Sequence, residues 1–147
     1  MNTRSITPRS ALALFLVLAL VPSYRAPAQT PVPPTFNLSG KVLNASGAHS
    51  IYVALWDEAH FLGQPVQQIR IAPGAPLVFQ FSVPPGHWAL SAYEDMNNNG
   101  ILDMGLFGPK EPSGFWHPFH AWRKPRFADV SVLIDRDMRS IDISLQP

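Results

Sequence analysis

The amino-acid sequence predicts an all-β protein: an antiparallel β-sandwich of seven strands with one long loop. Short runs carry apolar residues at alternate positions, which is the period of a half-buried strand. Turn signals rich in proline, glycine and asparagine separate most of these runs. No stretch shows a sustained helical period with caps, and the 16 prolines of the chain also disfavour helices. Two layers that bury one face of each strand are the simplest arrangement for such elements, so we expect a sandwich of immunoglobulin or prealbumin type.

The predicted strands begin after a proline-rich segment. In chain order, they cover residues 36–43, 51–56, 66–71, 77–83, 87–94, 127–134 and 141–145. The third of these strands is the most polar, so we expect it at a sheet edge. Residues from about 95 to 125 show no strand pattern, and long loops of this kind in compact domains are usually functional or disordered.

The fourth and fifth predicted strands define the expected core. Phe79 and Phe81 share one face of the fourth strand, and Trp88 and Leu90 share one face of the fifth. A turn at 84–86 separates the two strands. We therefore expect them to be adjacent and antiparallel, with these four side chains facing inward.

An export signal is predicted in residues 1–28. Arginines near the N-terminus precede an unbroken apolar run at 11–21, and Pro22 ends it. Eleven residues of helix rise about 16 Å, which is roughly half of the hydrocarbon core of a bilayer. Ala26-Pro27-Ala28 places small residues at the −3 and −1 positions, so we expect cleavage before Gln29.

The export signal implies a simple domain organisation. Residues 1–28 are the predicted signal peptide, residues 29–35 a proline-rich tether, and residues 36–147 the sandwich domain. No second apolar run has the length of a bilayer span, so we expect no membrane insertion after signal cleavage. The expected location is the periplasm or the extracellular space.

Charge and cysteine content exclude several classes of function. Three of the 11 basic residues (Arg4, Arg9 and Arg25) precede the cleavage site, which leaves 8 bases against 10 acids in the mature chain. A chain with this balance and no basic stripe is a poor candidate for nucleic-acid binding. The sequence has no cysteine, which excludes disulfides, zinc–thiolate sites and cysteine nucleophiles.

One part of the long loop has the spacing of an EF-hand-type calcium loop. Its oxygen-bearing side chains fall at relative positions 1, 3, 5 and 9: Asp95, Asn97, Asn99 and Asp103. Gly100 stands at position 6, where such loops turn sharply, and Ile101 at position 7 would contribute its carbonyl oxygen. Position 12 is Leu106 instead of a bidentate glutamate, so Glu111 is the expected substitute carboxylate. The alternative is an Asn/Gly-rich turn that binds nothing, because both residue types tolerate positive φ.

The same region resembles a known family. Residues 84–90, 94–103 and 108–115 follow, in order, the pattern of the uncharacterised bacterial exported family catalogued as domain of unknown function 2141. The resemblance covers most of the mature chain and implies an exported immunoglobulin-like or prealbumin-like sandwich without an assigned activity. This sequence has Trp88 in place of the usual tyrosine, Gly108 and Pro109 directly adjacent, and Trp116 where serine is common.

Aromatic residues crowd the second half of the long loop: Phe107, Phe115, Trp116, Phe119 and Trp122. They are expected to cover one open end of the sandwich, because a long loop needs apolar burial to stay ordered. Trp116 and Trp122 are the expected exposed pair and therefore a candidate ligand surface. His117 and His120 place two imidazoles three residues apart, but a solvated loop explains them more simply than a transition-metal site.

These features favour an exported, non-enzymatic module in which a calcium-type loop orders the aromatic segment. Its expected partner is a protein, a glycan or another envelope component. The alternative is a small metal-dependent envelope hydrolase that uses Asp95, Asp103 and Glu111 with a bound ion. The sequence contains neither a Gly-x-Ser-x-Gly elbow nor a phosphate-binding loop, so nothing beyond these acids points to catalysis.

Overall fold

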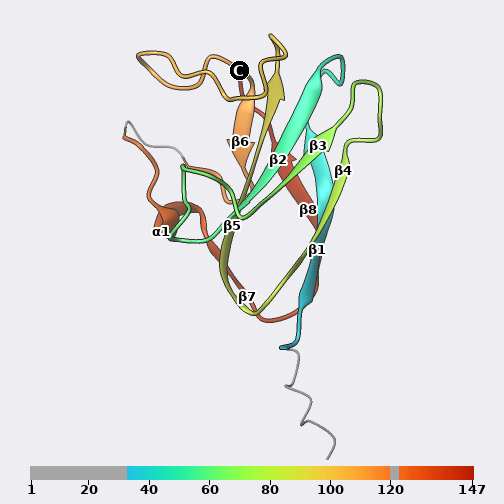
Figure 1. The fold of residues 1–147 in the computed structure, drawn as a ribbon, viewed down its shortest axis with the longest axis vertical. Helices are drawn as coiled ribbons and strands as arrows, with labels where there is room; N and C mark the ends of the chain where they lie inside the picture. Colours follow the sequence, from blue (N-terminus) through green and yellow to red (C-terminus); the bar gives the residue numbers. More distant parts are fainter. Residues whose placement is uncertain (1–32, 120–122) are drawn as a thin grey trace, which may run out of the picture. The chain divides into compact units, whose positions relative to one another are not determined.

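The structure, a computed structural model, describes residues 33–119 and 123–147 and is built almost entirely from β-strands (Figure 1). The predicted signal peptide, the first part of the predicted tether and the residues His120 and Trp122 lie outside the described residues. Within the described ranges, no helix has the length and hydropathy needed to cross a lipid bilayer.

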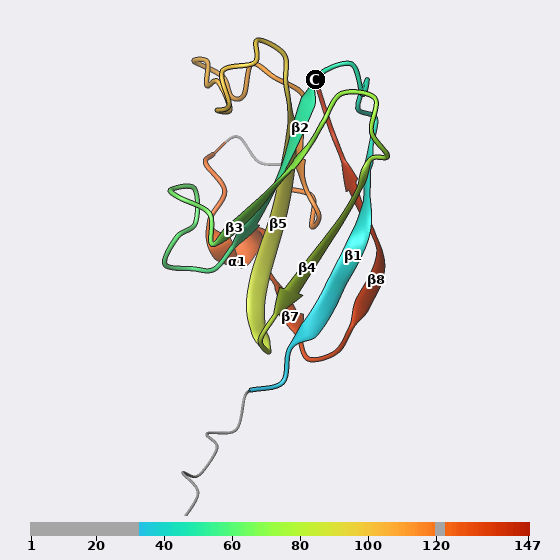
Figure 2. The same cartoon turned by 45° about the vertical axis from the view of Figure 1, so that its right-hand side comes forward.

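The strands form two facing sheets, which confirms the predicted all-β sandwich (Figure 2). The smaller sheet has the order β4-β1-β8, with β1 at Phe36–Leu43, β4 at Val78–Val83 and β8 at Met138–Ser144. The larger sheet has the order β3-β2-β5-β6, with β3 at Gln67–Ile71, β2 at Ser50–Trp56, β5 at Gly86–Asp95 and β6 at Ser113–Phe115. A short strand β7 at Val132–Ile134 pairs with the first residues of β5. The described residues thus contain eight strands, one more than the sequence predicts.

One strand pair departs from the expected antiparallel arrangement. The first strand β1 and the last strand β8 run parallel, while the other pairs of named strands are antiparallel. Their register shifts between Leu38 and Gly40, and the chains come very close there. A Cβ atom on Gly40 would lie 1.9 Å from the carbonyl oxygen of Ile141, so only glycine fits this position.

The inward faces of the fourth and fifth predicted strands are confirmed. The prediction that these two strands are neighbours in one sheet is wrong. Phe79, Phe81 and Leu90 are buried in the core, and Trp88 is partly buried against it. However, β4 pairs with β1 and β5 pairs with β2, so the turn at 84–86 carries the chain from one sheet to the other. Alternation along a strand reveals which face is buried but not which strand lies beside it.

The main hydrophobic core lies between the two sheets and draws on both. Its buried members include Leu38, Ile51, Val53, Leu55, Phe79, Phe81, Val83, Leu90, Ile134, Ile141 and Ile143. A second, smaller cluster lies on the outer face of β2 and β5, where Ala54, Trp56 and Ala89 meet Val130. The outer face of the larger sheet is therefore covered near this cluster.

The predicted strand at 127–134 begins as helix α1, which spans Phe127–Val130. The Asp129 carboxylate accepts the amide N–H of Arg126 at 2.7 Å, which satisfies a free donor at the start of the helix. Phe127 and Val130 then point into the second cluster, where Phe127 meets Phe61 edge-on at 5.7 Å between ring centroids. An apolar contact on the outer face of the sheet thus explains why these residues coil before β7 begins.

The stretch predicted to lack strands contains β6, which closes one side of the sandwich. Ser113 and Gln146 exchange two backbone hydrogen bonds of 3.0 Å, so the C-terminal end of the chain reaches across from the smaller sheet. A Cβ atom on Gly114 would lie 2.2 Å from the carbonyl oxygen of Ser144, so the two backbones touch directly. This contact fixes the end of the long loop against both sheets.

Candidate functional site

The predicted calcium-type loop begins at the end of β5 with Asp95, whose side chain is 1% exposed. Its Oδ1 accepts the N–H of Asn99 at 3.1 Å, and its Oδ2 accepts the N–H of Gly100 at 2.9 Å. Oδ1 of Asn97 accepts the same Asn99 N–H at 3.1 Å, and Oδ1 of Asn99 accepts the N–H of Ile101 at 2.9 Å. These bonds coil the backbone around the Asp95 carboxylate.

Gly100 is required at the sharpest point of this coil. Its φ is 79°, a left-handed value that glycine adopts without steric cost. Asn98 adopts φ 59° two residues earlier, which asparagine tolerates better than most residues. The local sequence therefore specifies the tight turn that the spacing predicts.

Asp103 lies across the loop from the two asparagines. Its Oδ2 accepts Nδ2 of Asn97 at 2.6 Å and Nδ2 of Asn99 at 3.3 Å. The structure thus brings together the four side chains predicted at positions 1, 3, 5 and 9. Within the described ranges, however, no group of three or more histidine, aspartate or glutamate side chains is arranged to hold a metal ion.

Glu111, the expected substitute for a glutamate at position 12, lies in the same loop. Its side chain is buried, and its Oε1 and Oε2 accept the N–H groups of Met96 at 2.8 Å and Asp103 at 3.2 Å. The carboxylate therefore joins the two ends of the coil. Both oxygens of Glu111 thus accept backbone N–H groups, as both oxygens of Asp95 do.

The loop rests on two tyrosines of the larger sheet. The rings of Tyr52 and Tyr93 stack at 5.2 Å, and the Tyr93 hydroxyl donates to the carbonyl oxygen of Gly100 at 3.0 Å. Burial raises the pKa of Tyr93 to about 12, and the nearby Tyr52, Asp95 and Glu111 add to the shift. The phenol therefore stays a neutral donor at physiological pH and anchors the turn.

Glu94, the neighbour of Asp95, points to a different part of the chain. Its buried carboxylate accepts the N–H and hydroxyl of Ser46 and the N–H of His49. Burial raises the pKa of Glu94, but these hydrogen bonds together outweigh burial and leave the pKa below its usual value. The Glu94 carboxylate thus fixes the connection between β1 and β2, while its backbone N–H donates to the carbonyl oxygen of Pro112 at 2.9 Å.

The loop continues into a hairpin that ends in an apolar tip, formed by Leu106 and Phe107. Met104 bridges Pro109, and the N–H of Gly105 donates to the carbonyl oxygen of Gly108 at 2.7 Å. The side chains of the apolar tip are 96% and 102% exposed. They are the most exposed large hydrophobic side chains of the described residues.

Among the described aromatic residues of the long loop, Phe107 is the most exposed. Trp116 is half-buried against the main core, and its backbone N–H donates to the carbonyl oxygen of Leu90 at 2.9 Å. Phe115 and Phe119 pack on the second cluster, so they cover the outer face of the larger sheet and not the expected open end of the sandwich. Trp122 lies outside the described residues. In the sequence, the signal for the tip is two large apolar residues enclosed by the glycines at 105 and 108.

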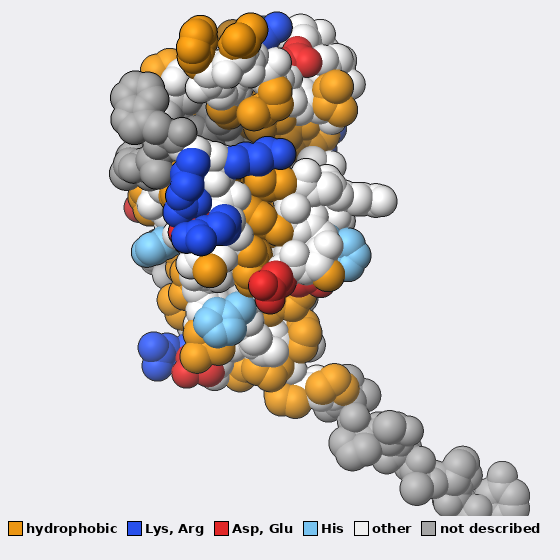
Figure 3. Space-filling view, turned by 90° about the vertical axis from the view of Figure 1, so that its left-hand side faces the viewer, with side chains coloured by type: hydrophobic (Ala, Val, Ile, Leu, Met, Phe, Trp, Pro, Cys, Tyr) orange, Lys and Arg blue, Asp and Glu red, His pale blue; other side chains and the backbone are white. Residues whose placement is uncertain are grey.

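A groove runs over the outer face of the larger sheet beneath this hairpin (Figure 3). Its volume is about 1190 Å³, and its lining includes Trp56, Leu62, Phe115, the apolar tip, Arg123 and Lys124. Figure 3 shows apolar side chains at the top of this face, and lysine and arginine side chains below them. The groove is thus apolar within and cationic along one wall.

The cationic wall belongs to residues 123–126, which we call the cationic segment. Arg123 donates to both oxygens of Asp129, at 2.7 and 2.9 Å, and its guanidinium lies 4.9 Å from the centre of the Phe119 ring. This pairing holds the pKa of Asp129 well below its usual range and raises the pKa of Arg123. Nδ1 of His117 lies 3.2 Å from the carbonyl oxygen of Asp129, so the histidine contacts α1, directly after the cationic segment.

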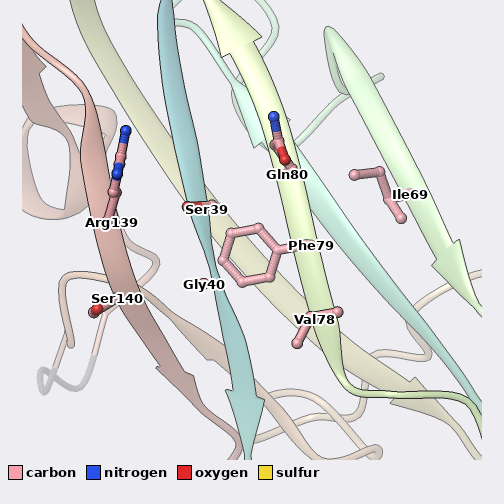
Figure 4. A pocket seen from close by; sticks show the side chains of 8 residues that line it. All are labelled: Ser39, Gly40, Ile69, Val78, Phe79, Gln80, Arg139 and Ser140. Atoms are coloured by element: carbon pink, nitrogen blue, oxygen red, sulfur yellow. The ribbon is translucent and has the colours of Figure 1, made fainter.

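A smaller hollow of about 550 Å³ lies at the other sheet (Figure 4). Residues of β1, β4 and β8 line it together with Ile69 of β3, and its one charged side chain is Arg139. The close-up shows that the polar side chains of Ser39, Gln80, Arg139 and Ser140 lie apart along the strands and do not point toward one another. The larger groove, which combines an apolar lining with cations, is the stronger candidate for a ligand site.

Comparisons with known proteins identify one family. A comparison with curated proteins found no significant match. Among solved structures, the chain is similar to a DUF3823 family protein from Parabacteroides merdae, with 14% sequence identity and a TM-score of 0.37. That match covers 79% of this chain and 48% of the other, so the chain spans about half the length of that protein. The model of the family described as uncharacterized protein conserved in bacteria (DUF2141) matches residues 42–142. Because this match covers more than half of the chain, the protein belongs to that bacterial family.

Proposed function

We propose that this protein is an exported, non-enzymatic binding module of the bacterial cell envelope, and that its binding site is the groove beneath the apolar tip. The observation that carries the proposal is the full exposure of Leu106 and Phe107 at the mouth of this groove. Exposed apolar patches beside polar residues mark interaction sites in soluble domains. The surrounding structure is fixed by hydrogen bonds, so the tip is presented by a rigid support.

The role of calcium in this proposal is to stabilise the loop that carries the tip. Asp95, Asn97, Asn99 and Asp103 offer carboxylate and amide oxygens, and the Ile101 carbonyl would add a main-chain oxygen; all are donors that Ca²⁺ prefers. Glu111 would hold the two ends of the loop in place and would also offer its carboxylate to the ion, since a carboxylate has about four lone-pair sites. Because backbone amides already compensate Asp95 and Glu111, calcium would reinforce an existing loop conformation.

The alternative of a metal-dependent hydrolase is not proposed. Both oxygens of Asp95 and both oxygens of Glu111 accept backbone N–H groups, and both side chains are buried. A general base needs access to the proton that it removes. The carboxylates of Asp95 and Glu111 instead serve the conformation of the backbone.

Binding through the groove is tested with the mature protein and two matched variants. Phe107→Ser removes the aromatic half of the tip, whereas Leu133→Ser removes an exposed side chain on β7, outside the groove. We expect cell-envelope fractions to retain the wild type and Leu133→Ser but not Phe107→Ser. Equal retention of all three proteins would show that the groove is not the binding site.

Calcium stabilisation is tested by the melting temperature of the mature protein in roughly 10 mM Ca²⁺ and in chelator at fixed ionic strength. Binding to the folded state alone stabilises by about 2.7 kcal/mol at a hundredfold excess over the Kd. We expect Asp103→Asn to remove most of this shift and Asp142→Asn, on the exposed surface of β8, to keep it. A melting temperature that is the same with calcium and with chelator would show that the loop is a hydrogen-bonded turn that binds no calcium.

A further inference from the structure

The shape of the apolar tip limits what it can bind. Leu106 and Phe107 stand at the end of a hairpin, with their side chains almost entirely outside the protein. Ile101 and Met104 on the same loop are also exposed and line the same groove. A protruding apolar tip needs either a matching pocket on a partner or a fluid apolar phase that closes around it.

The charges near the tip favour one of these two occupants. Arg123 and Lys124 line the groove that the tip overhangs, and the Lys110 side chain passes 3.4 Å from the position of a Cβ atom on Gly105, beside the tip. Arg123 pairs with Asp129, so these two charges compensate each other and Lys110 and Lys124 are the lysines that this face offers. Figure 3 shows acidic side chains on this face as well, but the lysine and arginine side chains form the larger continuous cluster there.

We propose that this face docks on an anionic lipid surface, with the apolar tip inserted among the acyl chains and the lysines beside the headgroups. The inference rests on the proposed function and names its partner. An apolar loop enters the boundary between headgroups and acyl chains without any complementary pocket, and nearby cations are attracted to anionic lipids. The two features that such docking needs occur together on this face and come from different segments of the chain.

A single protein partner fits these features less well. A protein would need a concave pocket for the tip and separate acidic groups for the lysines, whereas an anionic bilayer offers both an apolar phase and negative charge everywhere on its surface. Docking of this kind buries one hairpin end and leaves the sandwich in water. It inserts only the end of a loop, which goes beyond the expected absence of membrane insertion, and it needs no helix of membrane-spanning length.

Vesicle sedimentation with the mature protein tests the inference. Two vesicle compositions are compared, phosphatidylcholine alone and phosphatidylcholine with about one third phosphatidylglycerol. We expect binding to the anionic vesicles, and Leu106→Ser/Phe107→Ser should lower the partition coefficient by at least about tenfold for each apolar side chain lost. Leu133→Ser, which is exposed on β7, should bind as the wild type does.

A second pair of variants tests the electrostatic contribution. Lys110→Gln/Lys124→Gln should weaken binding to anionic vesicles by about fivefold for each lysine, and high salt should have a similar effect. Lys41→Gln removes an exposed lysine from β1 and should leave binding unchanged. Circular dichroism of each variant confirms that the sandwich is folded.

The outcomes separate this inference from the proposed function. Absence of vesicle binding, together with tip-dependent retention on envelope proteins or glycans, would overturn lipid docking and keep the binding module. A dimer that dissociates in Leu106→Ser/Phe107→Ser, without vesicle binding, would overturn it as well and assign the tip to self-association. Failure to bind vesicles or any envelope fraction would overturn both proposals.

Discussion

Phe81 is the residue whose truncation tests the main core most directly. It is 3% exposed on β4 and packs against Phe79 at 6.0 Å between ring centroids. We expect Phe81→Ala to lower the free energy of unfolding by about 3–5 kcal/mol, because the emptied site leaves a cavity between the sheets. Urea denaturation measures the loss. Val78, on the opposite face of the same strand, is 60% exposed, so Val78→Ala is the control and should cost less than about 1 kcal/mol.

The Glu94 carboxylate makes the free energy of unfolding depend on pH. Because its folded-state pKa lies below the usual 4.5, its contribution is fully present above that value and is lost as the pH falls through the folded pKa. We expect Glu94→Gln to lower the free energy of unfolding at pH 7 by about 1–3 kcal/mol. The difference from the wild type should shrink as the pH is lowered from about 5 to about 3. A difference that stays constant over this range would contradict an ionised Glu94.

Single residues of the candidate site were predictable to different degrees. The sequence places Asp95, Asn97, Asn99 and Asp103 in one coil, because their spacing and Gly100 specify the turn locally. Glu111 shares that loop, but its pairing with the amides of Met96 and Asp103 depends on how the hairpin folds back. The exposure of Phe107 has the same origin. Contacts between residues that are far apart in a loop produce no periodic pattern in the sequence, so they could not be predicted from it.

Strand β6 is the element on which the closure of the sandwich depends. A methyl group on Gly114 would meet the carbonyl oxygen of Ser144 at 2.2 Å, so Gly114→Ala must push β6 away from the chain end. We expect a loss of about 1–3 kcal/mol in thermal or urea denaturation, typical of overpacking. Gly63→Ala is the matched control, because its nearest neighbour would lie at 3.4 Å and its φ is not positive. Equal stability of the two variants would show that β6 and the C-terminal residues are not in tight contact.

The elements missed by the sequence share a physical cause. β6 has only three residues, Ser113–Phe115, and contains a glycine, so no alternation can be seen. α1 has four residues and is set by Asp129 and by contacts with Phe61 on another segment. The longer strands were predictable because their two-residue period extends over a buried face. The sheet to which each strand belongs could not be predicted, because the two-residue period shows which side chains are buried but not which strand lies beside them.

At the scale of the whole chain, we expect the mature protein to begin at Gln29. The apolar run before it is too short for a membrane anchor, and small residues precede the site. N-terminal sequencing or intact mass of the protein recovered from the cell envelope measures the cleavage site. Ala28→Asp should block processing there, because a charged residue replaces the small side chain at −1. Exported material that still begins at Met1 would contradict the prediction.

The parallel pairing of β1 and β8 has a mechanical consequence for a domain pulled from its two ends. Force applied at Phe36 and Ser144 acts along both strands in opposite directions, so all the hydrogen bonds of this pair must yield together. Force applied at Phe36 and Val83 acts on directly opposite residues of the antiparallel pair β1 and β4, which can separate one bond at a time. Single-molecule pulling should therefore require a markedly higher rupture force in the first geometry than in the second. The arrangement of the first and last strands thus makes the domain a shear-resistant link between whatever is attached at its two ends.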